Sequence, residues 1–396
     1  MPVPTPFHPR TAALCTSYGW KQWGGYYAVT HFGATHLPEY WAMRESAALT
    51  DVTPLFKYRV EGRDAARLLS RMTVRGFETA KVGRVAYTCW CDPRGKVIDD
   101  GTVSRLADER FFVTAAEPTL SWMTRLSRGL EVAIEDVSER IAALSLQGPT
   151  SRDLLRSCCD ADLDALRFFG TTDARLDGAA VRISRTGYTG DLGYELWCQA
   201  SDALAVWDAL MAAGRAYGIV PAGLDALDMA RVEAGFIMLG VDYYSSLQVT
   251  VDARRSTPYE IGLDWCVDLD RDAFVGQEAL RAEAARGPGW NLVGLEADWL
   301  AIERLYARHH LPPRLAAAAS RQSLPVYADG RFVGQVTSSV WSPLLKRHLS
   351  LASVRAGHAA PGTPLQLEHT VLYERSSVEA RVVEKPFFEP ERKRKP

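Results

Sequence analysis

The chain has 396 residues, of which 47% are hydrophobic and 24% charged, and its formal net charge is -2. This length provides enough apolar residues for two or three domains. Because charges of both signs are mixed along the chain, no global field would attract nucleic acid or an anionic membrane, and neither is expected as a partner.

The chain ends and the thiols are typical of an ordinary cytoplasmic protein. No stretch approaches the about 20 apolar residues of a membrane span, and MPVPTPFHPRTAALC lacks the basic start and apolar core of a signal peptide. The seven cysteines, including the pairs at 89/91 and 158/159, fit no zinc spacing, and the histidines are scattered. We therefore predict reduced thiols, no metal site, a cytoplasmic location and a solvated basic tail at 392–395.

In chain order, the first 50 residues are rich in aromatic side chains and end in a predicted helix, PEYWAMRESAAL. Asp64 is expected to cap a short helix, AARLLSRM. From Arg84 the hydrophobic period changes to two. The segments RVAYTCWC, KVIDDGTVSRL and FFVTAA, joined by the turns DPRG and ADER, predict an antiparallel meander.

The middle of the chain alternates strands and helices. IAALSLQGP and YELWC are predicted strands, TSRDLLRSC is a predicted helix, and AAVRISRTGYTG is a strand that runs into a glycine-rich loop. Ser201 is predicted to cap a long helix that stops at Gly218, and GLDALDMARVEAG is a further helix. Residues 281–323, with GPGW and LPPRLAAAAS, predict a linker or insertion before the many short strands of a small barrel or sandwich at 324–388.

Two adjacent carboxylates lie inside the second strand of the meander. Because neighbouring side chains in a strand point to opposite faces, Asp99 is grouped with Val97 and Val103, and Asp100 with Ile98. The two acids therefore cannot act together on one substrate, as the acid pair of a glycosidase does. At most one of them faces a pocket, and the alternative is that both serve only the strand.

The loop SRTGYTGDLGYELW is a second candidate site. Gly187, Gly190 and Gly193 would allow a tight turn and close approach of a ligand to the backbone. Because no Gly-Lys-Ser/Thr ending and no helix follow, nucleotide binding is not expected. Glu195, on the next strand, would point into the same pocket or into solvent.

The helix GLDALDMARVEAG and the segment after it supply further candidates. Helical spacing places Asp228 and Arg231 on one face, which leaves open an internal ion pair or an arginine beside a polar ligand. Tyr243 and Tyr244, just past the helix, are either packing aromatics or proton donors to a leaving group.

Nine segments match one family in order and spacing: RESAALTDV, GKVIDDG, LSLQGP, SRTGYTGDLGYEL, PAGLDALDMARVEAG, TPYEIGL, FVGQEAL, VGQVTSSVWSPLLKRHLSLASV and VVEKPFF. Over nearly its whole length the chain resembles the folate-dependent aminomethyltransferases typified by the T-protein of the glycine cleavage system. Within that family the nearest relatives are expected to be tetrahydrofolate-dependent demethylases, including those that act on aromatic methyl ethers.

The resemblance implies an α+β cloverleaf of three domains around a central folate-binding hole. A discontinuous first domain would comprise 1–54 and 141–280, and a ferredoxin-like second domain 55–140. The linker or insertion over 281–323 would then lead to a C-terminal β-barrel domain at 324–396.

The resemblance also implies roles for particular residues. Asp100 matches the family's catalytic acid beside the folate nitrogens, whereas Tyr87, Tyr188, Glu195 and Arg231 match positions that line the pterin site. A carboxylate suits a pterin because the ring presents adjacent N–H donors on one edge.

The expected activity is transfer of a one-carbon unit from a small O-, N- or S-methylated donor, with aromatic donors among the candidates, to the cofactor tetrahydrofolate. Tyr243 or Tyr244 would protonate the leaving group, with Tyr26 or Tyr27 as further candidates. The alternatives are an aminomethyltransferase that acts on a lipoyl carrier protein and a non-catalytic folate-binding protein.

Departures from the family bear on the donor more than on the folate. T-proteins have a histidine where this chain has Pro54 and an asparagine where Thr114 falls, and they lack the insertion at 294–315. The related folate-binding protein of iron–sulfur maintenance has a signature cysteine near the place of Phe274, which argues against that relative.

Overall fold

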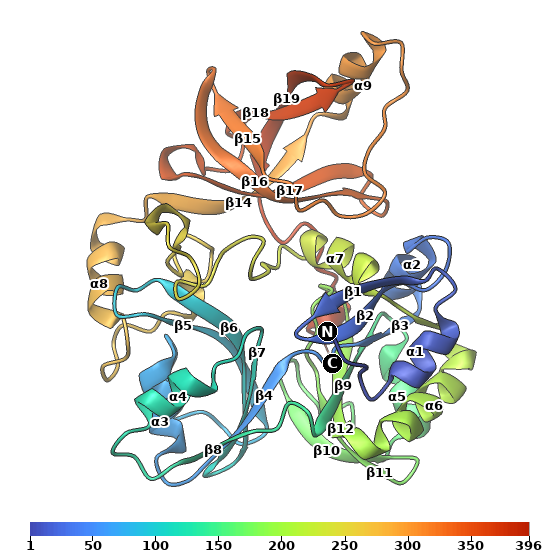
Figure 1. The fold of residues 1–396 in the computed structure, drawn as a ribbon, viewed down its shortest axis with the longest axis vertical. Helices are drawn as coiled ribbons and strands as arrows, with labels where there is room; N and C mark the ends of the chain where they lie inside the picture. The colour runs from blue at the N-terminus through green and yellow to red at the C-terminus, as the bar shows by residue number, and fades with distance from the viewer. Residues whose placement is uncertain (396) are drawn as a thin grey trace.

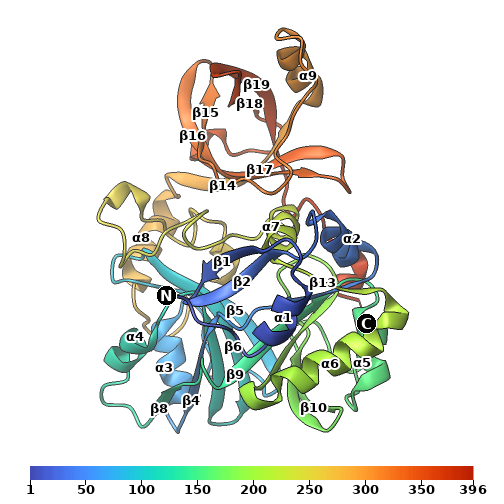
Figure 2. The ribbon, with the colours of Figure 1, turned by 45° about the vertical axis from the view of Figure 1, so that its right-hand side comes forward.

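The chain forms three lobes, each built on its own β-sheet, and a separate two-stranded hairpin (Figure 1). The computed structural model describes residues 1–395. The barrel lies above the other two lobes, and Figure 2 brings the hairpin of β1 (Gly19–Trp23) and β2 (Tyr26–His31) to the front. This is the three-domain cloverleaf that the resemblance implies.

The first domain has a six-stranded sheet in the order β10-β11-β12-β9-β3-β13. Its strands are β3 (Ala47–Asp51), β9 (Ile141–Gln147), β10 (Thr171–Leu176), β11 (Ala179–Ser184), β12 (Gly193–Gln199) and β13 (Ile219–Pro221). The helices of this domain are α1 (His8–Leu14), α2 (Leu37–Glu45), α5 (Ser151–Cys158), α6 (Ala203–Gly214) and α7 (Leu224–Glu233). The middle strand β9 is almost fully buried because Leu144 and Leu146 pack with Trp207 and Leu210 of α6.

The second domain has a five-stranded antiparallel sheet in the order β5-β6-β7-β4-β8. Its elements are β4 (Phe56–Glu61), α3 (Ala65–Met72), β5 (Arg84–Cys91), β6 (Val97–Ala107), β7 (Arg110–Ala115), α4 (Leu120–Leu126) and β8 (Ala133–Asp136). The predicted meander is confirmed as β5-β6-β7. The order β6-β7-β4-β8, with α3 and α4 on one face, is the expected ferredoxin-like arrangement, to which β5 adds an edge (Figure 1).

The third lobe is a closed barrel in the order β14-β17-β16-β15-β18-β19. Its elements are β14 (Trp290–Ala297), α9 (Trp299–Ala307), β15 (Leu324–Ala328), β16 (Arg331–Ser342), β17 (Arg347–Arg355), β18 (Pro364–Val371) and β19 (Glu374–Val383). The span 281–323, predicted as a linker or insertion, is therefore largely regular structure. It holds the end of α8 (Gln277–Arg286), the barrel strand β14 and α9, whose Ile302 and Leu305 pack into the barrel core.

Several local expectations also differ from the structure. The helix predicted from PEYWAMRESAAL ends at Glu45, and its last residues start strand β3 instead. Asp64 precedes α3, but its carboxylate accepts the N–H of Glu131 at 2.8 Å rather than a helix N–H. The helix predicted to start after Ser201 has Asp202 as its N-cap residue.

The basic run at 392–395 is not a solvated tail. Arg392 pairs with Asp191, with Nε and Oδ1 2.6 Å apart. The side chain of Lys393 is buried, and its ammonium lies 5.1 Å from the centre of the Phe236 ring. The C-terminal segment is therefore bound to the first domain.

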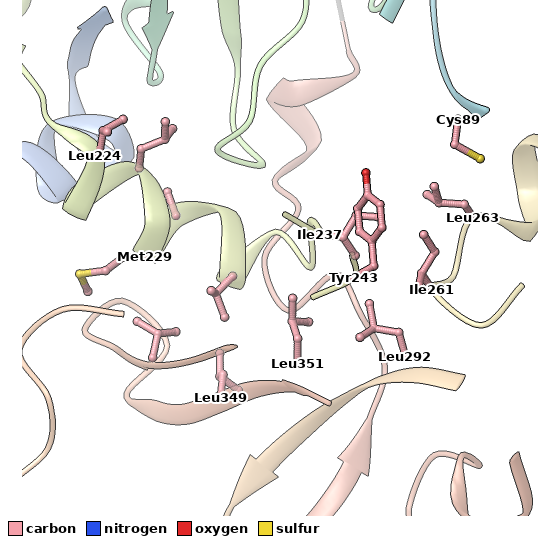
Figure 3. Packing of buried hydrophobic residues seen from close by; sticks show 14 of the residues in the cluster. Cys89, Leu224, Met229, Ile237, Tyr243, Ile261, Leu263, Leu292, Leu349 and Leu351 are labelled. Carbon is pink, nitrogen blue, oxygen red and sulfur yellow. The ribbon is translucent and has the colours of Figure 1, made fainter. Parts of the chain in front are cut away.

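A central apolar core joins the three lobes (Figure 3). It combines Cys89 of the second domain, Met229 of the first and Leu292 of the barrel. Tyr243 stands in this core near Ile237 (Figure 3). Among residues 1–395, no helix has the length and apolar character needed to cross a bilayer.

Candidate functional site

Asp100 is held by two tyrosines at the edge of the central core. It faces Cys89 in the β5–β6 ladder, and Tyr87, two residues away along β5, lies on the same face. The Tyr87 hydroxyl donates to Oδ2 of Asp100 at 2.7 Å, and the Tyr243 hydroxyl donates to Oδ1. The structure thus brings together three of the residues singled out in the sequence.

The environment of this carboxylate favours its neutral form more than water does. Burial raises the pKa of Asp100, although the hydrogen bonds from Tyr243 and Tyr87 counteract part of this shift. Burial and the charge of Asp100 raise the pKa values of both phenols well above their ordinary value. Both tyrosines therefore stay protonated at neutral pH and act as hydrogen-bond donors.

Asp99 turns to the other side of the strand. It is fully buried, Oδ1 accepts the backbone N–H of Asp100 at 2.8 Å, and Oδ2 accepts that of Glu117 at 2.9 Å. Burial and the neighbouring carboxylate raise its pKa well above the ordinary value. Asp99 therefore ties β6 to the segment after β7, while Asp100 faces the central core.

The predicted grouping of their neighbours is wrong at one end. A β-bulge makes Val97 and Asp99 the partners of consecutive residues on β5, so that Ile98 is the extra residue. Val97 consequently lies in the central core beside Cys89, whereas Ile98 packs in the core of the second domain.

Glu195 and Tyr188, two further residues that the sequence singled out, belong to the first domain. Oε2 of Glu195 accepts the hydroxyl hydrogen of Thr186, whereas its Oε1 receives no hydrogen bond from residues 1–395. Burial raises the pKa of Glu195. Tyr188 donates its hydroxyl to the carbonyl of Ile237 and stacks on Phe236, with ring centres 5.7 Å apart.

Gly187, Gly190 and Gly193 of the glycine-rich loop lack a side chain where other atoms of the protein pack closely. A Cβ at Gly187 or Gly193 would come within 2.1 Å of the Gln147 amide, and one at Gly190 would meet Ala234 at 2.7 Å. The Gln147 amide accepts the Thr189 hydroxyl at 2.9 Å and so fastens the loop. The expectation that these glycines admit a ligand is therefore not what the structure shows.

Arg231 forms the internal ion pair that the sequence left open. Its Nε lies 2.7 Å from Asp228, and Nη1 lies 2.5 Å from Asp242. Its Nη2 donates to the hydroxyl of Ser338 on β16 at 2.7 Å. Because protein groups take up this fully buried guanidinium, Arg231 joins α7 to the barrel rather than presenting itself to a ligand.

The other tyrosines lie apart from Asp100. The Tyr244 ring packs under Arg254, whose guanidinium is 5.7 Å from the ring centre. Tyr27 lies beside His8 and Trp20 in the N-terminal segment, and the pKa of the neighbouring Tyr26 is raised mainly by burial. Of the tyrosines proposed as proton donors, only Tyr243 contacts the site carboxylate.

Two residues of this region escaped the sequence analysis. Asp242 anchors Arg231 and accepts the Ser338 hydroxyl at 2.7 Å. Trp265, which is 57% exposed, stacks on Tyr87 with ring centres 6.0 Å apart and an interplanar angle of 17°. A tryptophan in a loop otherwise rich in acids was a signal that could have drawn attention to this position.

These features define a three-lobed protein in which two domains and the base of a barrel meet around a carboxylate held by tyrosines. The chain belongs to the glycine cleavage T-protein family. The family model "GCVT N-terminal domain" matches residues 7–271, and the model "Glycine cleavage T-protein C-terminal barrel domain" matches residues 311–389.

Curated relatives match over most of the chain. It is 34% identical to an aminomethyltransferase of Streptomyces avermitilis, covering 90% of this chain and 92% of the relative, and 31% identical to that of Bacillus subtilis, covering 93% and 97%. It is also 33% identical to a trimethylamine-oxide aldolase of Ruegeria pomeroyi, covering 92% of this chain and 44% of that protein. The crystal structure of the glycine cleavage aminomethyltransferase T of Bartonella henselae has the same fold, with a TM-score of 0.83 at 22% identity over 98% of this chain and 99% of that one.

Proposed function

We propose that this protein is an enzyme that transfers an aminomethyl-derived one-carbon unit to tetrahydrofolate. The names of the similar curated proteins support aminomethyl transfer better than the demethylation that the sequence alone favoured. The observation that carries the proposal is Asp100, a carboxylate of raised pKa held by Tyr87 and Tyr243 where the three lobes meet.

The residues around Asp100 fit a pterin. Asp100, Glu195, Tyr87 and Tyr188 all keep part of their surface exposed, although they lie inside the molecule. Oε1 of Glu195 has no partner among residues 1–395, and each oxygen of Asp100 can accept a second hydrogen bond. These acceptors suit adjacent N–H donors on one edge of a ring, and the phenol rings suit its faces.

When bound, tetrahydrofolate supplies the nucleophilic amine that accepts the one-carbon unit. Glu195 would orient the ring, and Asp100 would hold an N–H hydrogen and exchange a proton with it. A carboxyl whose pKa is raised by burial suits this exchange because its pKa lies closer to neutral pH. Tyr87 and Tyr243 fix the direction of the carboxylate, so that donor and acceptor meet in a near-attack geometry.

A methyl donor is the second candidate, and two observations favour it. Trp23 and Trp41 pack against the central core, which suits a small apolar or aromatic donor. The Tyr243 hydroxyl also lies on Asp100, so that a proton source for a leaving alkoxide or phenolate is in place. Pro54 and Thr114, where T-proteins have a histidine and an asparagine, also bear on the choice between an aminomethyl and a methyl donor.

One assay separates these functions. The protein and tetrahydrofolate are incubated either with an aminomethyl-loaded lipoyl carrier protein or with a panel of free O-, N- and S-methylated compounds, and the folate product is identified by mass. A methylene product that requires the carrier supports aminomethyl transfer. A methyl product formed from a free donor without the carrier supports demethylation and removes the first proposal.

A binding protein without catalysis would behave differently. It would bind tetrahydrofolate in a calorimeter, give no product with any donor, and keep its cellular role when Asp100 is replaced by asparagine. Failure to bind tetrahydrofolate would overturn all three functions.

A further inference from the structure

The C-terminal segment, residues 387–395, lies against the loop that carries Tyr188 of the proposed folate site. A Cβ at Gly190 of this loop would meet the carbonyl oxygen of Phe388 at 3.2 Å. The backbone N–H of Phe388 donates to the carbonyl of Glu233, at the end of α7, at 2.9 Å. The segment therefore contacts the loop directly, two residues after Tyr188.

The same segment binds the loop on both sides of Tyr188. On the N-terminal side, Nη2 of the buried Arg185 donates to the carbonyl oxygens of Arg392 and Lys393 at 3.3 and 3.2 Å. On the C-terminal side, the carboxylate of Asp191 accepts two hydrogen bonds from the Arg392 guanidinium, at 2.6 Å from Nε and 2.7 Å from Nη2. The Asp191 side chain has no exposed surface. Because a paired, charge-assisted contact of this kind fixes direction as well as position, Arg392 restrains the loop.

A third contact reaches the ring of Tyr188 through Phe236. The two rings stack, with centres 5.7 Å apart and an interplanar angle of 22°. The ammonium of Lys393 lies 5.1 Å from the centre of the Phe236 ring and pairs with Glu389 of its own segment at 2.8 Å. A cation over an aromatic face is attracted by the electrons of the ring. The C-terminal segment thus also holds the ring on which Tyr188 stacks.

Resting on the proposed function, we infer that Arg392 is a positioning residue of the folate site, which acts through Asp191 to keep the Tyr188 ring in place against the pterin. The other cation near Asp191 does not replace it, because Arg44 lies 4.0 Å away and its guanidinium is 2.7 Å from Glu233. Without Arg392 the loop would adopt further conformations, and folate would bind only the fraction of molecules in which Tyr188 is in place. The expected loss is therefore one of folate affinity rather than of chemistry.

The test compares Arg392→Gln with the charge-retaining variant Arg392→Lys and with Arg394→Gln. Arg394 is a matched control because it is exposed and pairs with Glu389. The Kd of 5-formyltetrahydrofolate, measured by isothermal titration calorimetry, should rise about fivefold in Arg392→Gln and stay unchanged in Arg394→Gln. Arg392→Lys should restore part of the affinity. In steady-state assays the KM for tetrahydrofolate should rise with the Kd, while kcat and the KM for the donor stay within about twofold.

A second measurement uses the unmodified protein. Trypsin cleaves after Arg392 only in molecules whose C-terminal segment has left the first domain, because a protease needs an accessible backbone. If detachment of the segment weakens folate binding, folate must disfavour detachment by the same factor. Saturating 5-formyltetrahydrofolate should therefore slow the loss of residues 393–396, followed by intact mass, about fivefold.

Two results would overturn the inference. One is an unchanged Kd in Arg392→Gln at a lowered Tm, since the segment would then only stabilise the fold. The other is tryptic cleavage after Arg392 at the same rate with and without folate, a result that does not depend on whether any variant folds. If the unmodified protein does not bind 5-formyltetrahydrofolate, the proposed function fails instead.

Discussion

Replacing Asp100 with asparagine keeps the size of the side chain but removes its charge and turns one oxygen into an NH2 group. In the unmodified protein each oxygen of Asp100 accepts a phenol O–H, from Tyr243 at Oδ1 and from Tyr87 at Oδ2. In the variant the NH2 group would replace one of these acceptors, so that one phenol O–H would face another donor. A hydrogen bond to a charged group contributes about 1.5–3 kcal/mol. Losing one such bond to the folate would weaken binding about 10- to 100-fold. Calorimetry with 5-formyltetrahydrofolate measures this loss, and turnover should fall with it.

The same change at Asp99 should damage the fold instead. Its two oxygens accept the backbone N–H groups of Asp100 and Glu117, and an asparagine can accept only one of them. The other N–H would face the new NH2 group in a fully buried place, which costs about 1–3 kcal/mol. Asp99→Asn should therefore lower Tm by a few degrees in differential scanning calorimetry and leave the folate Kd unchanged.

The reasoning fails if the two variants exchange their effects. A loss of folate affinity in Asp99→Asn as large as in Asp100→Asn, at an unchanged Tm, would show that both carboxylates face the ligand. Normal affinity and turnover in Asp100→Asn would show that this carboxylate has no part in the site.

Three further predictions concern the surroundings of the site. Tyr243→Phe removes a donor that lowers the pKa of the site carboxylate, so that the acid limb of the kcat/KM profile should move to higher pH, whereas Tyr244→Phe should leave the profile unchanged. Arg231→Gln leaves the buried Asp242 without its cation, although Asp228 keeps its pair with Arg321, and should destabilise the protein by about 3–5 kcal/mol, seen as a large fall in Tm that the exposed control Arg10→Gln does not show. Because burial raises the folded-state pKa of Glu195, its contribution to stability is present below its unfolded pKa and is lost as pH rises through the folded pKa. Glu195→Gln should therefore raise Tm near neutral pH but not near pH ~4; an equal change at both would contradict this.

The sequence predicted the meander and the separation of its two acids because period-two alternation is a local property of a strand. It did not predict the bulge, because the extra residue appears only when β6 is paired with β5. The prediction therefore assigned Ile98 to the wrong face of the strand, whereas it correctly placed Asp99 and Asp100 on opposite faces.

The local sequence pattern also could not predict contacts with segments that are distant in the sequence. Helical spacing allowed an Asp228–Arg231 pair, but Ser338 of the barrel and Asp242 complete the environment that occupies this arginine. The glycine loop looked open to a ligand until Gln147 of a neighbouring strand filled the space. Likewise, β14 starts at the last residue of the turn signal GPGW and fell in the span predicted as a linker or insertion, because only its pairing with β17 and β19 makes it a barrel strand.

The C-terminal segment has a mechanical consequence for the barrel. The chain enters the barrel after α8, beside the second domain, and on leaving it returns to the first. There the N–H groups of Phe387 and Phe388 bind the carbonyl of Glu233 at 3.0 and 2.9 Å, and Arg392 clasps Asp191. The barrel is thus tethered at both ends, and it can move away from Asp100 only after this C-terminal segment has detached from the first domain.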